Sequence, residues 1–195
     1  MIGDWGIRRA CWNVLAGGVI AYPTEAVWGL GCDPWDQSAV ERLLRLKQRS
    51  WQQGLILVAS RWCHIEPLLT TLKPDQRMRL QASWPGPNTW LLPDSGNWIP
   101  PWIKGRHRTV AIRLSAHPRI VSLCDATGGL LVSTSANRSG TAPARTSLQV
   151  RLAFRQQLDY ILPGSLAYAT GPSQICDLQT GAIIRASQSL DRNQK

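Results

Sequence analysis

The stretch Val19–Gly31, VIAYPTEAVWGLG, indicates a buried strand that opens into a glycine-containing loop. Its first residues, Val19–Tyr22, form a short apolar run of the kind found in the interior strands of a sheet. A proline ends the run, and Thr24 and Glu25 then offer a hydroxyl and a carboxylate. Glycines at the end of a strand let the backbone approach a ligand closely. The same pattern also fits a tight turn with a capping threonine, so the residues alone leave both interpretations open.

The rest of the chain alternates between helical and strand patterns, without an internal repeat or a linker that would divide it. The expected helices are Asp4–Ala16, a second from a cap at Asp36 or Ser38 to about Gln48, Cys63–Leu69, Asp75–Ser83, Pro118–Ala126 and Ser147–Phe154. The further expected strands are Leu55–Val58, Thr89–Leu92, Val110–Leu114, Leu130–Thr134, Leu158–Leu162, Ile175–Leu178 and Ala182–Arg185. This pattern predicts a single-domain α/β fold over residues 1–195, with a mixed sheet covered by helices.

The charge of the chain favours anionic partners. Its 195 residues carry 22 Lys and Arg against 12 Asp and Glu, which gives a net charge of +10. Such an excess suits nucleotide phosphates, tRNA or both, although it also serves solubility alone. The sequence contains no run of about 18 apolar residues, so we expect no membrane span. The charged N-terminal residues do not fit a secretory signal, so we expect a cytoplasmic protein. The five cysteines form no C-x-x-C pair, which argues against a zinc site or a disulfide framework.

Two segments offer cations and a hydroxyl beside predicted turns. Lys47 and Arg49 come at the end of the helix that closes near Gln48. Cations at a helix C-terminus often only complement the helix dipole, yet such a pair can also grip a triphosphate. The second segment, Trp84–Thr89, reads WPGPNT and predicts a rigid turn that leads into a strand. Thr89 could donate its hydroxyl to a phosphate, but a turn is the default interpretation.

A hydroxyl-rich loop, Ser133–Gly140, follows the strand that ends near Thr134. It reads STSANRSG. A loop of this composition after a strand resembles an anion or nucleotide cradle. It lacks the glycine and lysine pattern of a P-loop and the G-x-S-x-G pattern of a serine hydrolase, so neither of those classes is indicated.

Taken together and in this order, these segments resemble the YrdC/TsaC family, the threonylcarbamoyl-AMP synthases. The matching residues are Pro23–Gly31, Lys47–Arg49, Trp84–Thr89, Ala111–Arg113 and Ser133–Gly140. The resemblance covers about residues 8–186 and corresponds to the short form of the family, a single YrdC-like domain. It implies a twisted, mixed α/β sheet with flanking helices and one concave, positively charged face.

The resemblance also implies a nucleotidyltransferase reaction. L-threonine takes up bicarbonate or CO2 at its amino group, and the product attacks the α-phosphate of ATP, which releases pyrophosphate and leaves L-threonylcarbamoyladenylate. That intermediate serves the formation of N6-threonylcarbamoyladenosine (t6A) at position 37 of tRNA, through the proteins of a transfer complex. Mg²⁺ is expected to enter with ATP and not through a metal site of the protein.

The implied site residues divide between the two substrates. Lys47 and Arg49 would hold the triphosphate by position and charge, with no covalent nucleophile. Arg113 would hold the threonine carboxylate as a fork. The full sets are Lys47, Arg49, Thr89, Ser133, Ser135, Asn137, Arg145 and Arg185 for ATP, and Thr24, Arg113 and Ser173 for threonine.

The chain departs from the family pattern at two places beside the predicted triphosphate site. Ser50 stands where relatives usually have proline, and Gln53 stands where a lysine is common. The missing cation could weaken triphosphate binding unless another arginine substitutes for it. Trp28 replaces a frequent Tyr or Phe, which alters the shape of a pocket more than its chemistry. The basic segment Lys104–Arg108 is a candidate for a loop that closes over the site.

Two other functions are compatible with these residues. A YrdC-like binding module could hold tRNA or double-stranded RNA on the basic face without synthesis. A related domain could adenylate another carbamoyl compound. The complete set of predicted ligand residues favours the synthase, because an RNA-binding module needs no pocket for threonine.

Overall fold

A twisted sheet forms the centre of the molecule. The computed structural model describes residues 3–167, 171 and 173–186. Within these residues nine strands pair in the order β7-β1-β2-β6-β3-β5-β4-β8-β9. They are β1 (Ile20–Pro23), β2 (Trp28–Gly31), β3 (Ile56–Ala59), β4 (Asn88–Pro93), β5 (Thr109–Leu114), β6 (Leu131–Ser135), β7 (Tyr160–Ile161), β8 (Gln174–Asp177) and β9 (Ile183–Arg185). Parallel pairing joins β7 to β1, β3 to β5 and β4 to β8, and the other neighbours are antiparallel, so the sheet is mixed.

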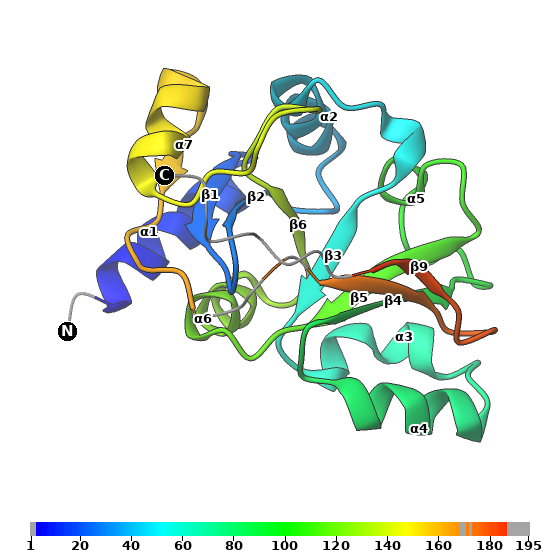
Figure 1. Cartoon of the computed structure of the whole chain (residues 1–195). Helices are drawn as coiled ribbons and strands as arrows, with labels where there is room; N and C mark the ends of the chain where they lie inside the picture. Colours follow the sequence, from blue (N-terminus) through cyan, green and yellow to red (C-terminus); the bar gives the residue numbers. More distant parts are fainter. Residues whose placement is uncertain (1–2, 168–170, 172, 187–195) are drawn as a thin grey trace.

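Helices surround this sheet, as Figure 1 shows. They are α1 (Gly3–Leu15), α2 (Gln37–Lys47), α3 (Glu66–Leu69), α4 (Pro74–Ser83), α5 (Pro101–Lys104), α6 (Pro118–Thr127) and α7 (Ser147–Phe154). Short 3₁₀ turns cover Trp51–Gln53, Trp62–Ile65 and Arg155–Gln157. Asp36 is the cap of α2, because its carboxylate accepts a hydrogen bond of 3.0 Å from the Ala39 amide.

The alternation of side chains along each strand separates two apolar clusters, one on each face of the sheet. On β1, Ile20 and Tyr22 pack into a cluster with residues of α1 and α6, whereas Ala21 packs into the opposite cluster. The opposite cluster contains buried residues of α2, α3, α4, α5 and α7. On their own face, α1 contacts β1 and β7, and α6 contacts β3 and β6. Among the described residues, these two helices make their main sheet contacts away from β5, β4 and β8, which leaves that part of the face for a site.

The structure confirms the predicted α/β class, and most helices and strands lie within a few residues of the expected bounds. The main difference is Trp28–Gly31, which the sequence placed in a loop and which forms β2 between β1 and β6. The expected strand Leu158–Leu162 is reduced to the two residues of β7, and the short helix α5 was not predicted. No helix in the described part of the chain combines the length and the apolar character needed to cross a membrane.

Gly31 explains why the loop pattern gives way to a strand. A Cβ atom at this position would lie 2.5 Å from the carbonyl oxygen of Val132 and 2.8 Å from Cε1 of Tyr22. The glycine therefore lets β2 pack directly against the ring of Tyr22 and the backbone of β6. The sequence pattern suggested that these glycines let the backbone approach a ligand. At Gly31 the glycine instead lets the backbone approach Tyr22 and Val132 of the same chain.

Replacement of Gly31 should therefore destabilise the fold. We expect Gly31→Ala to lower the free energy of unfolding by about 1–3 kcal/mol, because the added methyl group overpacks against backbone that cannot move aside cheaply. Gly96→Ala is the matched control, since a Cβ atom there meets no heavy atom within 4 Å. Urea unfolding followed by tryptophan fluorescence measures both variants. Equal stability of the two variants would contradict this account of β2.

Candidate functional site

A cavity of about 330 Å³ lies on the same face of the sheet as α6, and Ile120 of that helix is part of its lining. The strand register brings its lining residues together. On β5, Ala111 and Arg113 line the cavity, and Ile112 between them is buried in the opposite cluster. Ile56 of β3 lies opposite Ala111 on one side and opposite Ser133 of β6 on the other. Residues far apart in the sequence thus form one continuous floor.

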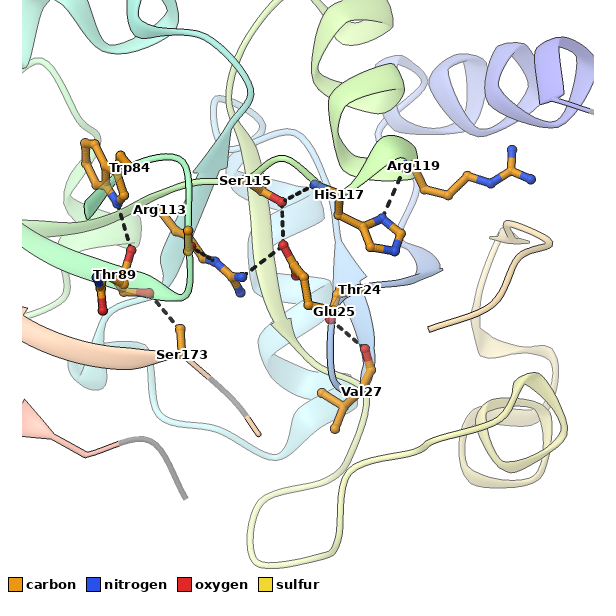
Figure 2. Close-up of polar contacts among 12 residues, drawn as sticks. Thr24, Glu25, Val27, Trp84, Thr89, Arg113, Ser115, His117, Arg119 and Ser173 are labelled. Carbon is orange, nitrogen blue, oxygen red and sulfur yellow. Dashed lines mark hydrogen bonds and ion pairs between the residues drawn. The ribbon is translucent and has the colours of Figure 1, made fainter. Parts of the chain in front are cut away.

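Glu25 and Arg113 both line this cavity and form an ion pair, which Figure 2 marks with a dashed line. The distance from Arg113 Nη2 to Glu25 Oε1 is 2.9 Å, and the two side chains are 14% and 18% exposed. The hydroxyl of Ser115 donates to the same carboxylate oxygen at 2.6 Å. The Nε atom of Arg113 donates to the carbonyl of Gly86 at 3.1 Å, so this arginine is held from two sides.

His117 connects this ion pair to the start of α6. Its backbone amide donates to the Ser115 hydroxyl oxygen at 3.1 Å, and its Nδ1 accepts a hydrogen bond of 3.2 Å from the Arg119 amide. An accepting Nδ1 carries no proton. Burial lowers the pKa of His117 below its usual value, and although the charge of Glu25 opposes this, the charges of Arg113 and Arg119 add to it. A neutral histidine therefore caps α6 beside the site.

Lys47 is buried behind the Ser133–Gly140 loop. Its ammonium donates to the carbonyls of Ser135 and Asn137, the latter at 2.8 Å, and only 3% of the residue is exposed. The Ser135 hydroxyl donates to Asn137 Oδ1 at 2.6 Å. Burial, followed by the positive charge of Arg49, lowers the pKa of the Lys47 ammonium to about 8. In this arrangement Lys47 fixes the backbone of the loop.

Two arginines face the cavity from separate segments. Arg49 Nη2 donates to the Gly54 carbonyl at 2.9 Å, and its buried Nε has no hydrogen-bond partner among the residues that the structure describes. Burial, together with the nearby charge of Arg185, lowers the pKa of Arg49 below its usual value. Arg185 Nη2 donates to the Ser173 carbonyl at 3.0 Å. Like charges held together in this way favour an anion between them.

The predicted hydroxyl residues Thr24, Thr89 and Ser173 are already hydrogen-bonded. Thr24 Oγ1 donates to the Val27 carbonyl at 2.6 Å and closes the turn between β1 and β2. The hydroxyl oxygens of Thr89 and Ser173 lie 2.8 Å apart. Thr89 is fully buried, whereas Ser173 lines the cavity. Thr89 is therefore placed to orient Ser173.

The segment expected to close over the site is anchored at its first residue. Lys104 ends α5, and its ammonium lies 2.7 Å from Asp94 Oδ2 in a pair that is almost completely buried. The Arg106 amide donates to the Gln52 carbonyl at 3.2 Å. His107 lines the cavity, so the segment borders the site. Its closure stays a prediction.

The structure brings most of the predicted site residues to one cavity. Those that line it are Thr24, Arg49, Arg113, Ser133, Ser135, Ser173 and Arg185, and Lys47, Asn137 and Thr89 contact lining residues from behind. Arg145 is apart from them, exposed before α7, and its amide donates to Gln149 Oε1 at 2.7 Å. No group of three or more His, Cys, Asp or Glu side chains that could hold a metal ion occurs among the described residues.

Sequence reasoning gave no role to several residues that line the cavity. Glu25 was noted beside Thr24, but its pairing with Arg113 joins positions far apart in the chain. Thr109 had a usable signal: it precedes Arg113 by four residues in a strand, and strand alternation alone places both on one face.

Comparison with known proteins assigns the family. The Sua5/YciO/YrdC family model, described as "Telomere recombination", matches residues 13–187. This chain belongs to that family. A relative from Nitrosococcus oceani, named threonylcarbamoyl-AMP synthase, is 50% identical over 182 residues, which cover 93% of this chain and 98% of the relative. A relative of the same name from Stutzerimonas stutzeri is 52% identical over 185 residues, which cover 95% and 99%.

A solved structure of a Sua5 protein has the same fold. The crystal structure of P. abyssi Sua5 complexed with L-threonine matches this chain with a TM-score of 0.84 at 30% identity. The match covers 92% of this chain and 52% of the Sua5 chain, so this chain spans about half the length of that protein. Together these relatives confirm the resemblance read from the five sequence segments.

The burial of Lys47 predicts an unusual dependence of stability on pH. The folded side chain gives up its proton near pH 8, whereas the unfolded one keeps it to about its usual value of 10.5. Between these values the unfolded state binds more protons, so stability rises with pH. We expect the free energy of unfolding of the wild type, relative to Lys47→Met, to increase by about 2 kcal/mol from pH 8 to pH 10. Urea unfolding of both proteins at each pH measures this difference, and a flat difference would contradict it.

Proposed function

We propose that this chain makes L-threonylcarbamoyladenylate from L-threonine, bicarbonate or CO2, and ATP, with release of pyrophosphate. The observation that carries the proposal is about 50% identity, over nearly the whole of both chains, to relatives named threonylcarbamoyl-AMP synthase. The cavity supports it, because one end offers an arginine–glutamate pair and the other offers unneutralised cations. These two ends suit an amino acid and a triphosphate.

The reaction requires the protein to position the substrates and to stabilise the charge that develops on the phosphates. The threonine amine forms a C–N bond to CO2, loses a proton and gives N-carboxythreonine. An oxygen of the new carboxylate then attacks the α-phosphorus of ATP, and the bond from that phosphorus to the bridging oxygen breaks to release pyrophosphate. No step needs a covalent bond to the protein. Donors held in place around the phosphates stabilise the charge that develops on them.

The residue roles follow from the two ends of the cavity. Arg113 would bind the threonine carboxylate, with Thr24 and Ser173 nearby. The complex of P. abyssi Sua5 with L-threonine supports a threonine site in a protein of the same fold. Arg49 and Arg185 would bind the phosphates.

The predicted loop residues would act at the nucleotide end. Ser133 and Ser135 line the cavity and would contact ATP, while Lys47 and Asn137 would hold their loop in shape. Thr89 would act through Ser173. A contact of Arg145 with ATP would require the substrate to extend beyond the cavity or the loop before α7 to move.

The other partners belong to the same proposal. Mg²⁺ would arrive with ATP, because Mg²⁺ commonly binds phosphate oxygens and water. Bicarbonate, tRNA, the proteins of a t6A transfer complex and a cytoplasmic location follow from the proposed reaction. A concave basic face for RNA is supported by the net charge of +10.

Pyrophosphate release tests the proposal directly. With ATP, Mg²⁺ and bicarbonate, the purified chain should release pyrophosphate only when L-threonine is added. Carbamoyl phosphate in place of threonine and bicarbonate should give none, which separates the synthase from a domain that adenylates another carbamoyl compound. No release, together with retained binding to tRNA, would favour the RNA-binding module.

Substitutions of Arg113 and Arg49 should affect the kinetic parameters of different substrates. We expect Arg113→Ala to raise the KM for L-threonine by roughly 10- to 100-fold, because a charge-assisted contact is lost. Arg49→Ala should instead lower kcat/KM for ATP by roughly 100-fold, since its contact is to the reacting phosphates. Arg151→Ala, an exposed arginine of α7, is the control and should change neither value appreciably. A selective loss of ATP binding in Arg113→Ala would move Arg113 to the nucleotide end.

A further inference from the structure

Glu25 is the only acidic side chain among the described residues that line the cavity. Its two carboxylate oxygens have different surroundings. Oε1 accepts from Ser115 at 2.6 Å and pairs with Arg113 at 2.9 Å. Oε2 is buried and has no hydrogen-bond partner among the residues that the structure describes. A buried, charged oxygen without a donor is costly, so a donor from outside the chain would stabilise it.

The chemistry of that donor follows from the pairing with Arg113. A free α-amino acid carries a carboxylate and an ammonium group on one carbon atom. Arg113 and Glu25 present the complementary charges side by side in the lining of the cavity. An amino acid that places its carboxylate on Arg113 therefore brings its nitrogen close to Glu25. A ligand with only a carboxylate would satisfy the arginine and leave Oε2 without a donor.

We propose that Glu25 binds the α-amino group of the substrate amino acid. The site thereby selects an amino acid over a hydroxy acid that lacks the amino group. This inference rests on the proposed function, which it deepens by naming a specificity-determining residue. The terminal torsion of a glutamate is soft, so a small rotation turns Oε2 toward the ligand while the carboxylate stays beside Arg113 and Ser115. The ammonium, the free amine and the carbamate that follows each keep at least one N–H, so the contact persists through the reaction.

A purely structural role makes a different prediction. If Glu25 only holds Arg113 in place, its loss weakens every ligand that carries a carboxylate. If Glu25 binds the amino group, its loss weakens only ligands that have one. L-threonine and (R)-3-hydroxybutyrate separate the two cases, because the second compound keeps the carboxylate, hydroxyl and methyl groups and lacks the amino group.

The experiment measures the Kd of both compounds by calorimetry, with the full chain saturated with α,β-methylene-ATP, whose α–β bridge cannot be cleaved. We expect the wild type to bind L-threonine about 10- to 100-fold more tightly than (R)-3-hydroxybutyrate. Glu25→Gln keeps an oxygen for Arg113 and Ser115 but places an N–H donor at the other position. In this variant the preference should fall to within about threefold. Arg113→Ala, the comparison variant, should weaken both compounds and keep the preference.

Two results would overturn the proposal. One is a Glu25→Gln variant that weakens both compounds equally and keeps the wild-type preference. The other result is obtained with the wild type alone: equal Kd values for (R)-3-hydroxybutyrate and L-threonine. Threonine-dependent pyrophosphate release by the wild type is measured in parallel. Its presence together with either result refutes only the role of Glu25, whereas its absence refutes the synthase itself.

Discussion

The pairing of β3 with β5 on one side and β6 on the other is the constraint on which the site depends. This pairing sets Val58 opposite Arg113 and Ile56 opposite Ser133. Because side chains alternate along a strand, a slip of one residue in either pair would turn the functional groups of one strand into the opposite apolar cluster. Burial of apolar residues under the helices thus fixes which polar residues face the cavity. The core and the site are specified by the same register.

The two ends of the cavity carry opposite electrostatic problems. At one end Glu25 offsets the charge of Arg113 within the chain. At the other, Arg49 and Arg185 lie near each other and neither forms an ion pair among the described residues, while the buried Lys47 adds a third positive charge close to Arg49. Burying uncompensated cations costs stability, which an anionic ligand would return on binding. We therefore expect an anionic ligand to stabilise this part of the protein when it binds.

The sequence predicted the strands whose signal is local and missed the one whose stability comes from distant partners. Apolar runs such as Leu55–Val58 can be recognised as strands from the sequence alone. Trp28–Gly31 has two glycines in four residues, and its stability as a strand depends on pairing with Ser135 and Thr134. The residues that line the cavity were expected from their motifs, whereas the contacts that each of them makes within the chain were not. Nothing near Lys47 in the sequence indicates that its ammonium is enclosed by carbonyls about 90 residues away.

Each end of the cavity is attached to the fold mainly by its own hydrogen bonds, which explains how one small sheet could hold the two proposed substrates. The Glu25–Arg113 end is fixed through Ser115 and His117 to the start of α6, whereas the proposed nucleotide end is fixed through Lys47 to the loop after β6. One hydrogen bond also joins residues assigned to different substrates, because Arg185 donates to the carbonyl of Ser173 at 3.0 Å. A change at one end should therefore reach the other through the Arg185–Ser173 contact and through the strand register. Separate supports allow each end to fit its own ligand while the sheet keeps the reacting groups in line.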